Sequence, residues 1–323
     1  MRPVVSLIIP VYNCEKYLEK ALLSAKQQDC GGLEIIVVED CSTDGSRRIV
    51  GQTEGITAVY HEKNMGLSAS RNDGMKLARG EYVCFMDADD FIETNHISLL
   101  LKGLTENSAD WAVGSVCEEH ISEKGTQERR ISAEAGVFSG KEKLLALEQQ
   151  TLLGYAWNKL YKKSIIDEHR LQFENVPLIE DILFNLSYAA HAQRVYVCAE
   201  PTYHYARRME SSLTHKVIPQ YIELQTRRIE ESLAFFGDTE SSVQALAAIY
   251  ARYLLSFCER LYSAKVKKKQ KKVVEVRNTA VCQRLSPYFP FPKNIMLKLP
   301  LLTGSLLYFM KKYLHPLFEK LSK

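Results

Sequence analysis

The sequence lacks most features of a specialised class of protein. Its eight cysteines are scattered singly, with no CxxC pair and no His/Cys metal spacing. This usage argues against a structural zinc site or a disulfide framework, and predicts reduced thiols in the cytosol. The longest uncharged run near the end, Leu299 to Met310, is shorter than the roughly 20 apolar residues that cross a bilayer. We therefore expect no spanning helix, and no signal peptide before the first apolar run.

Two nucleotide-binding motifs are also missing. No GxGxxG follows the first apolar run, and the chain has no GxxxxGK[ST], which disfavours dinucleotide-binding and P-loop proteins. The net charge of +3 is too small to indicate nucleic acid by itself, and no recognised nucleic-acid motif accompanies it. With 46% hydrophobic and 25% charged residues, the chain has the composition of a globular protein.

The first 95 residues alternate between apolar runs and helical patterns. We expect Asn13 to cap the helix after the first run, and Ser68 to cap a helix that ends at Arg79. This alternation predicts a doubly wound, mostly parallel α/β sheet. The predicted strands are Val4 to Val11, Glu34 to Val38, Thr57 to Tyr60 and Tyr82 to Met86.

Polar clusters follow the ends of all four predicted strands. Because the carboxyl ends of parallel strands meet at one edge of a sheet, we expect these clusters to converge on a ligand. The last cluster holds Asp87, Asp89 and Asp90, whose mutual repulsion must be relieved by water, a hydrogen-bond donor or a cation. Mg²⁺ or Mn²⁺ would suit these carboxylates and leave positions for phosphate oxygens, so a nucleotide is indicated. A solvated acidic turn is the alternative.

The order of three segments, LIIPVYN, EIIVVEDCSTDGS and KNMGLSASRNDGMKLARGEYVCFMDADD, resembles the family 2 glycosyltransferases of the GT-A fold. The resemblance covers Val4 to about Asn95. Two departures are visible: Glu39 stands where Asp is usual, and Cys41 where Gly or Asn is common.

The resemblance implies a nucleotide-sugar site of the bacterial polysaccharide type. Tyr12 would lie against a uracil ring, Asp40 would accept the uracil N3 proton, and Arg71 would sit near the base and diphosphate. Asp87 would face the ribose and sugar, and Asp89 would hold Mn²⁺ or Mg²⁺. The implied donor-binding residues are Pro10, Val11, Tyr12, Asp40, Asn64, Arg71, Asp87, Ala88, Arg207 and Arg208.

Three of these residues also have ordinary structural interpretations. Asp40 can serve as an acid near a helix N-terminus, and Tyr12 can pack in the core. Arg71 can be a surface arginine on its helix. A carboxylate at Asp40 would nevertheless discriminate against purines, because it would leave a purine acceptor nitrogen unpaired.

Acceptor-side residues are implied farther along the chain. Trp157 lies in GYAWNKLYKK, which resembles the family's acceptor-side segment; its ring can stack on a sugar or simply be buried. Glu180 and Asp181 lie in the first turn of a predicted helix from Val176 to Leu186. Acids there stabilise the helix dipole, but the pair also matches the family position of the general base, for which we choose Asp181.

The segment Pro201 to Thr214 resembles the family's loop over the diphosphate. Arg207, Arg208 and Ser212 are phosphate candidates, His204 is a weaker metal or phosphate candidate, and solvated surface arginines are the alternative. Asp110 to Val116 and Arg194 to Cys198 are predicted strands, and Lys141 to Gln150 a helix. Glu118 to Ala135, charged and poor in large apolar residues, is predicted to be an exposed loop.

The last third is predicted to be helical and basic. Residues 1–216 form the expected catalytic domain, with a nucleotide-sugar half to about residue 95 and an acceptor half beyond it; 217–323 form the helical region. Helical spacing runs from Ile218 to Phe236 and from Val243 to Lys265. Basic clusters at Lys265 to Lys272 and Lys298 to Lys323 suit an anionic membrane surface, with a solvated lysine face as the alternative.

The sequence therefore predicts a cytoplasmic, metal-dependent, inverting glycosyltransferase of the hexosyl type. A UDP-sugar would be the donor and a saccharide or lipid-linked saccharide the acceptor, with peripheral attachment to the inner face of the plasma membrane and no role for nucleic acid. Two alternatives remain open. One is a noncatalytic nucleotide-sugar-binding scaffold, and the other is a nucleotidyltransferase, although the basic, glycine-rich phosphate loop usual in nucleotidyltransferases is absent after Val11.

Overall fold

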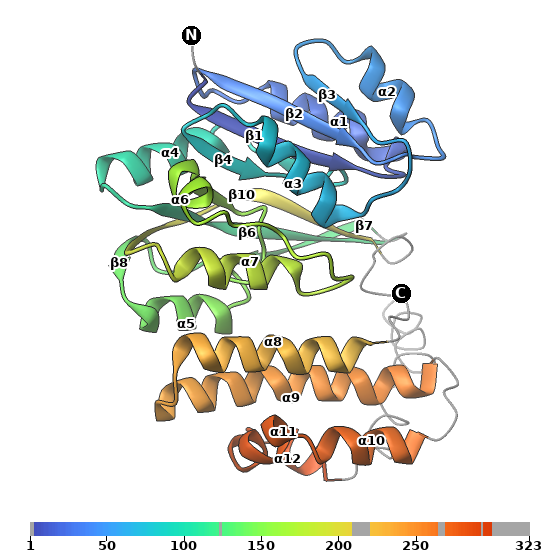
Figure 1. The fold of residues 1–323 in the computed structure, drawn as a ribbon, viewed down its shortest axis with the longest axis vertical. Coiled ribbons are helices and arrows are strands. Elements are labelled where there is room, and N and C mark those ends of the chain that lie inside the picture. Colours follow the sequence, from blue (N-terminus) through green and yellow to red (C-terminus); the bar gives the residue numbers. More distant parts are fainter. Residues whose placement is uncertain (1–2, 123–124, 209–219, 264–268, 292, 299–323) are drawn as a thin grey trace. The chain divides into compact units, whose positions relative to one another are not determined.

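The computed structural model describes residues 3–122, 125–208, 220–263, 269–291 and 293–298 (Figure 1). The chain divides into two compact units, Met1–His215 and Lys216–Lys323. The first unit is built on a sheet covered by helices. The described part of the second unit is helical.

The sheet of the first unit runs in the order β3-β2-β1-β4-β9-β6-β10-β5, with β7 added to β6 and β8 to β10. Neighbours among β3, β2, β1 and β4 pair in parallel, as do β6 and β10, whereas β9 is antiparallel to both its neighbours. The strands are β1 Val5–Val11, β2 Leu33–Glu39, β3 Thr57–Tyr60, β4 Tyr82–Phe85, β5 Phe91–Ile92, β6 Trp111–Ser122, β7 Gly125–Ile131, β8 Gly136–Ser139, β9 Lys159–Lys162 and β10 Arg194–Arg208.

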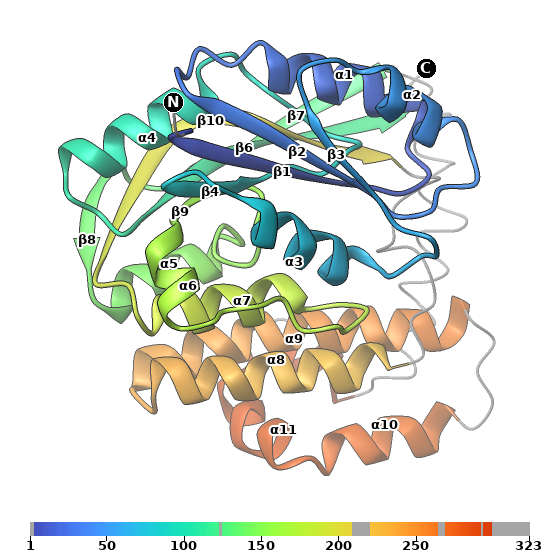
Figure 2. The same ribbon diagram turned by 45° about the horizontal axis from the view of Figure 1, so that its top comes forward.

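The predicted α/β fold is confirmed, and the four predicted strands of the first 95 residues all form. Every residue of β1 is buried, as expected of an apolar strand covered on both faces. Figure 2 shows α1 and α2 on one face of the sheet and α3 and α7 on the other. The helices of this unit are α1 Glu15–Lys26, α2 Ser46–Gln52, α3 Leu67–Leu77, α4 His96–Glu106, α5 Lys141–Gln149, α6 Lys163–Glu168 and α7 Glu180–Ala189.

Helix α3 lies close against β1 because residue 74 is glycine. A Cβ atom at Gly74 would lie 2.4 Å from Cγ2 of Ile8, which is closer than real contacts allow. A larger residue would push the helix away from the sheet. Arg71 lies one turn earlier on α3, so this close approach also holds Arg71 near the carboxyl ends of the strands.

Two predicted helix caps are wrong. Asn13 does not cap α1; it has φ 52°, and its Oδ1 accepts a hydrogen bond from the Thr43 N–H at 2.8 Å. Ser68 lies inside α3, whose N-cap is Gly66, and its hydroxyl donates to the carbonyl of Glu174 at 2.8 Å. In both cases a tertiary partner holds the side chain that could have capped the helix.

The predicted loops at Glu118 to Ala135 and Pro201 to Thr214 are wrong over most of their described residues, although residues 132–135 do form a connection without regular structure. β6 and β7 form an antiparallel hairpin, and β10 continues to Arg208. Residues 125–130 of β7 are exposed, and among the described strands β7 pairs with β6 alone. Such a strand needs no alternation of apolar and polar residues, so its sequence does not indicate a strand. Ser212 lies outside the described residues.

The second unit confirms the predicted helices. Its apolar stripe of Leu246, Ile249, Leu254 and Phe257 is buried on α9. Lys265 to Lys268 and residues 299–323 lie outside the described ranges. None of the described helices is long and apolar enough to cross a membrane. The elements are α8 Tyr221–Phe236, α9 Glu240–Ser263, α10 Lys269–Arg277, α11 Ala280–Leu285, a short 3-10 helix Ser286–Tyr288, and α12 Lys293–Met296.

Candidate active site

The segments that follow β1, β2, β3 and β4 meet at one edge of the sheet, because these neighbouring strands are parallel. We call residues 12–14, 40–45, 61–66 and 87–90 the strand-end loops. Hydrogen bonds join the first two: the Asn13 N–H donates to the Ser42 hydroxyl at 3.0 Å, and the Asp40 N–H donates to the Val11 carbonyl at 2.9 Å. The polar clusters predicted from the sequence therefore share one rim.

Asp40 organises the third strand-end loop. Its Oδ1 accepts hydrogen bonds from the Met65 N–H and from Nδ1 of His61, both at 2.7 Å, and its Oδ2 accepts one from the Gly66 N–H at 2.8 Å. A carboxylate offers about four lone-pair positions, so one remains on Oδ2. The far nitrogen of His61 lies 3.2 Å from Oδ2 of Asp73, which holds the imidazole between two carboxylates.

The other predicted donor residues of this rim differ in exposure. Tyr12 is 45% exposed, so its ring has an open face. Asn64 is also exposed in the third loop. Pro10, Val11 and Ala88 are buried, so any contact they make with a ligand must use little more than backbone atoms.

The three acids after β4 have different surroundings. Asp90 is buried, where its Oδ2 accepts from the Tyr203 hydroxyl at 3.0 Å and its Oδ1 from the Ala206 N–H at 2.8 Å. Burial and the neighbouring acids Asp89 and Asp87 hold the pKa of Asp90 well above its usual value. Asp89 remains 42% exposed at its side chain, and burial raises its pKa while the Arg208 guanidinium lowers it.

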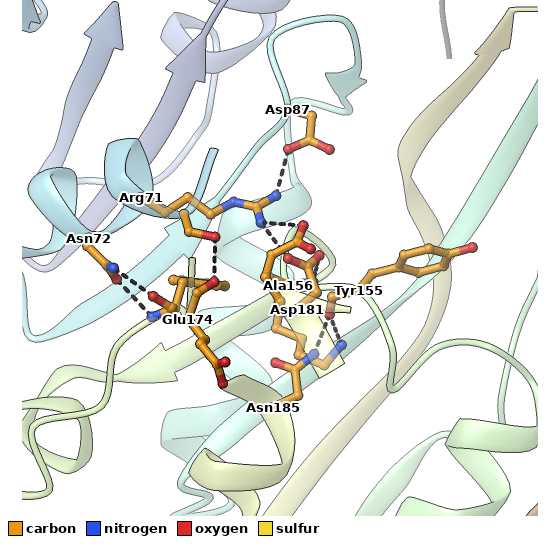
Figure 3. A network of polar contacts seen from close by, with 12 residues as sticks. Arg71, Asn72, Asp87, Tyr155, Ala156, Glu174, Asp181 and Asn185 are labelled. Carbon is orange, nitrogen blue, oxygen red and sulfur yellow. Dashed lines mark hydrogen bonds and ion pairs between the residues drawn. The ribbon is translucent and has the colours of Figure 1, made fainter. Parts of the chain in front are cut away.

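Arg71 connects the strand-end loops to α7, as Figure 3 shows. Its Nη2 lies 3.0 Å from Oδ1 of Asp87, and its Nη1 pairs with Oδ1 of Asp181 and lies 3.8 Å from Oε1 of Glu180. The side chain is 1% exposed, which excludes the surface-arginine interpretation. Burial alone would lower the pKa of Arg71, but the three carboxylates raise it above its ordinary value, so the guanidinium stays charged.

Two of the carboxyl groups around Arg71, those of Asp87 and Glu180, have raised pKa values. Burial and the charges of Asp89 and Asp181 raise the pKa of Asp87 to about 6, although Arg71 acts in the opposite direction. Burial and the neighbouring Asp181 raise the pKa of Glu180 to about 7. Clusters of opposed charge with such shifts are typical of functional sites.

The first turn of α7 is set by an unusual backbone. Ile179, immediately before Glu180, has φ 69° and ψ 0°, a left-handed conformation that a β-branched residue rarely adopts. Helix α3 holds the segment before Ile179 in place, because the Asn72 side chain forms two hydrogen bonds of 2.8 Å with the backbone of Phe173. Strained backbone held by surrounding structure is common at functional sites.

The 152–158 loop forms the other wall beside Asp181. The Ala156 N–H donates to Oδ2 of Asp181 at 2.9 Å. Asn185 Nδ2 donates to the carbonyls of Leu153 and Tyr155 at 2.7 and 2.9 Å, and buried Lys159 donates to Leu152, Tyr155 and Asn158. These contacts satisfy the backbone carbonyls of a loop that is largely buried.

Trp157 is buried, with 3% of its surface exposed. Its ring stacks between Tyr155 and Tyr203, with centroid separations of 4.4 and 4.1 Å. Both faces of the indole are thus covered, and neither is open to a sugar. The partly exposed rings beside it are those of Tyr155 and Tyr205, which lie 5.9 Å apart.

The structure separates the two arginines at the end of β10. Successive strand residues point to opposite faces. Arg208 Nη1 lies 3.5 Å from Oδ2 of Asp89, and its guanidinium covers the ring of Tyr17, whereas Arg207 lies 3.8 Å from Glu118. Arg208 therefore joins the acidic cluster and Arg207 does not.

The weaker candidate His204 has partners on both ring nitrogens. Nδ1 lies 2.8 Å from Glu119 and Nε2 lies 2.8 Å from Glu93. Neither nitrogen is open to a metal or a phosphate in this arrangement.

A divalent cation fits Asp89 better than it fits its neighbours. Within the described ranges no group of three His, Cys, Asp or Glu side chains is arranged to hold a metal. Internal hydrogen bonds occupy Asp90, and Arg71 pairs with Asp87. The side chain of Asp89 is 42% exposed, and its ion-pair partner among the described residues is Arg208, at 3.5 Å. One hard carboxylate oxygen with open positions around it suits Mg²⁺ or Mn²⁺ together with phosphate oxygens.

Several residues of the site were missed in the sequence. His61 follows a predicted strand, as the other candidates do, and that position could have revealed it. Lys159 stands two residues after Trp157, but lysines are almost always exposed, so nothing in the sequence predicted that this one is buried in the site. Asn185 and Tyr203 gave no signal, because their hydrogen-bond partners lie far away in the chain.

Known proteins resemble this chain along most of its length. The family model described as "Glycosyl transferase family 2" matches residues 6–170. The putative glycosyltransferase EpsH of Bacillus subtilis is 30% identical over 248 residues, which cover 75% of this chain and 70% of EpsH. The poly(ribitol-phosphate) beta-N-acetylglucosaminyltransferase TarS of Staphylococcus aureus is 29% identical over 212 residues, 64% of this chain and 36% of TarS.

Solved structures share the fold. S. aureus TarS 1-349 in complex with UDP-GlcNAc superimposes with a TM-score of 0.70 at 22% identity, covering 94% of this chain and 89% of that one. The mannosyltransferase PcManGT of Pyrobaculum calidifontis, in complex with GDP-Man and Mn²⁺, has a TM-score of 0.55 at 16% identity, covering 97% and 88%.

Proposed function

Because the chain belongs to glycosyl transferase family 2, we propose that it moves a hexosyl group from a UDP-sugar to an acceptor hydroxyl with inversion at the anomeric carbon. The observation that carries the proposal is the position of Arg71. One buried guanidinium contacts Asp87 on the strand-end loops and Asp181 on α7, and this closeness of the two residues supports a single site for donor and acceptor.

Asp181 is the proposed general base. Each of its oxygens accepts one hydrogen bond, from Arg71 and from Ala156, so lone pairs remain for an incoming hydroxyl. An ordinary aspartate pKa is near 4, so the carboxylate takes the proton only as the acceptor oxygen forms its bond to the anomeric carbon. The bond from that carbon to the diphosphate oxygen breaks in the same step, and UDP departs with the bonding electrons.

The negative charge that develops on the departing diphosphate must also be stabilised. Arg208 beside Asp89 supplies a cation at the acidic cluster. Asp89 would hold Mn²⁺ or Mg²⁺, which supplies Lewis-acid stabilisation of the diphosphate when bound. The Mn²⁺ in the PcManGT complex supports a metal here.

The choice of UDP rests on two supports. UDP-GlcNAc is bound in the TarS complex, which has the same fold. In this chain, Tyr12 offers an open aromatic face, and Oδ2 of Asp40 keeps a lone pair for the imide N–H of uracil. A purine would present an acceptor nitrogen to that carboxylate and leave both groups unpaired.

The deciding experiment compares Asp181→Asn with the natural protein. Titration calorimetry with UDP and Mn²⁺ should give the same affinity for both, while transfer of sugar from UDP-sugars, followed by UDP release, should fall by about 10²- to 10⁴-fold. Asp167→Asn, at an exposed acid of α6, is the matched control. UDP binding without turnover in the natural protein would instead identify a scaffold, and pyrophosphate release from a nucleoside triphosphate a nucleotidyltransferase.

The proposed setting is polysaccharide or glycolipid assembly at the inner face of the plasma membrane. Helix α10 carries Lys271 and Lys272 beside Val274, which is 48% exposed, and each lysine adds roughly 1 kcal/mol near an anionic surface. Cosedimentation with anionic liposomes should weaken when Lys269, Lys271 and Lys272 are replaced by Gln. Unchanged cosedimentation would rule out attachment through this helix.

A further inference from the structure

Lys159 is a buried lysine whose hydrogen-bond partners, within the described part of the chain, are two backbone carbonyls and a side-chain amide. It is 0% exposed, and its Nζ donates to the carbonyl of Leu152 at 2.8 Å, to Oδ1 of Asn158 at 2.8 Å and to the carbonyl of Tyr155. An ammonium group has three N–H donors, and all three are used on oxygens of the 152–158 loop and its end. Burying a cation costs free energy, which these three hydrogen bonds offset.

The carbonyl of Tyr155 belongs to the same peptide unit as the Ala156 N–H. A trans peptide is planar, and its C=O and N–H point in opposite directions. In Figure 3 the Tyr155–Ala156 segment lies between Asn185 on one side and Asp181 on the other. Lys159 and Asn185 both donate to the Tyr155 oxygen, and together they fix the direction in which the Ala156 N–H points, towards Oδ2 of Asp181 at 2.9 Å.

We propose that Lys159 is a positioning residue for Asp181, acting through the Tyr155–Ala156 peptide. The inference rests on the proposed role of Asp181 as base. The Lys159 cation orients the peptide plane and draws electrons from its carbonyl, which strengthens the N–H as a donor. Asp181 is then held with one oxygen on Arg71 and the other on Ala156, leaving its free lone pairs in one fixed direction.

The charge of Lys159 is sensitive to pH near neutrality. Burial lowers the pKa of Lys159 to about 7, while the negative charges of Asp181 on α7 and Glu148 on α5 act in the opposite direction. A neutral amine has two N–H groups and one lone pair, so it cannot donate to three oxygens. Loss of the proton as pH rises through about 7 should release one of these oxygens and loosen the peptide.

The test measures turnover against pH, between pH 6 and 9, for the natural protein, Lys159→Arg and Lys159→Met. Turnover of the natural protein should fall as pH rises above about 7. Lys159→Arg keeps a permanent cation, so the turnover of this variant should not fall as pH rises above about 7. Lys159→Met should lower turnover on the order of tenfold to a hundredfold at pH 7, because the general base is displaced from its position. The variant should show no alkaline decline, because methionine does not titrate. The KM for UDP-sugar should change less than twofold in both variants.

Lys163→Met, four residues along the chain, is the matched control, because the ammonium group of Lys163 pairs with the carboxylate of Asp167 on the same helix. An alkaline decline that persists in Lys159→Arg, or a loss expressed in KM with turnover intact, overturns the inference. If Lys159→Met does not fold, the profile of Lys159→Arg decides. A natural protein that binds no UDP and transfers no sugar would overturn the proposed function instead.

Discussion

The two sides of the site are built in different ways. The strand-end loops are backbone turns at the ends of parallel strands. Buried Asp40 and Asp90 hold these turns, while Tyr12 and Asn64 lie exposed at the rim. The 152–158 loop and the first turn of α7 instead depend on buried polar groups, including Lys159 and Asn185. We infer that changes on the first side alter ligand affinity, whereas changes on the second alter turnover and stability together, because a buried polar network fails as a unit.

The largest effect is expected from Asn185→Leu, on the buried side. The amide donates to Leu153 and Tyr155 and accepts from the hydroxyl of Tyr161 at 2.6 Å. Its loss leaves buried groups without partners, so the free energy of unfolding should fall by about 3 kcal/mol, as measured by urea denaturation. Turnover should fall as well.

Asn175→Leu, at an exposed amide of the segment that leads to α7, is the control and should leave stability within about 0.5 kcal/mol of the natural value. Equal stability of the two variants would contradict the distinction between the two sides.

The next effect concerns Glu180, whose pKa is raised to about 7. Between about pH 4.5 and 7 the folded protein binds a proton at Glu180 that the unfolded chain has lost, so stability falls as pH rises through this window. Glu180→Gln cannot ionise and should avoid that loss. Compared with the natural protein, the variant should gain roughly 1 to 3 kcal/mol on going from pH 5 to pH 8.

Thermal or urea unfolding at both pH values measures this difference. A difference that stays constant between pH 5 and pH 8 would mean that Glu180 is ionised throughout and that Arg71 fully compensates its burial.

A smaller effect is expected at Tyr12, on the exposed side. Stacking of a base on an aromatic ring contributes about 1 to 3 kcal/mol, so Tyr12→Leu should weaken UDP binding roughly fivefold to a hundredfold in calorimetry. The unfolding free energy should change little, because the ring is 45% exposed. A loss of stability without a loss of affinity would reverse the assignment of this residue.

The smallest effect is expected at Arg207. Because it faces Glu118 and not Asp89, Arg207→Gln should change transfer less than twofold, and the pair itself contributes at most about 1 kcal/mol. Arg208→Gln, one position along, should slow transfer by at least tenfold. Equal effects of the two variants would show that β10 rearranges when donor binds.

The sequence predicted the exposed side better than the buried side. The strand-end loops follow apolar runs that predict strands, and the α/β alternation brings those ends together without further information. Trp157 was predicted near the acceptor, but its two faces are covered by tyrosines from residues 155 and 203. Tyr155 is two residues away in the chain, but nothing in the local sequence indicates that the distant Tyr203 covers the second face.

By itself, the sequence determined the order of strands and helices in the first 95 residues and the positions of Asp40, Asp87 and Asp89 after strand ends, because hydrophobic periodicity is a local property. Tertiary structure alone decided that Arg71 lies buried among three carboxylates, that Arg207 and Arg208 face different partners, and that Lys159 holds the peptide beside Asp181. Each of these depends on contacts between residues that are distant in the chain or on which face of a strand is covered, and pairings of that kind are fixed only when the whole core is packed.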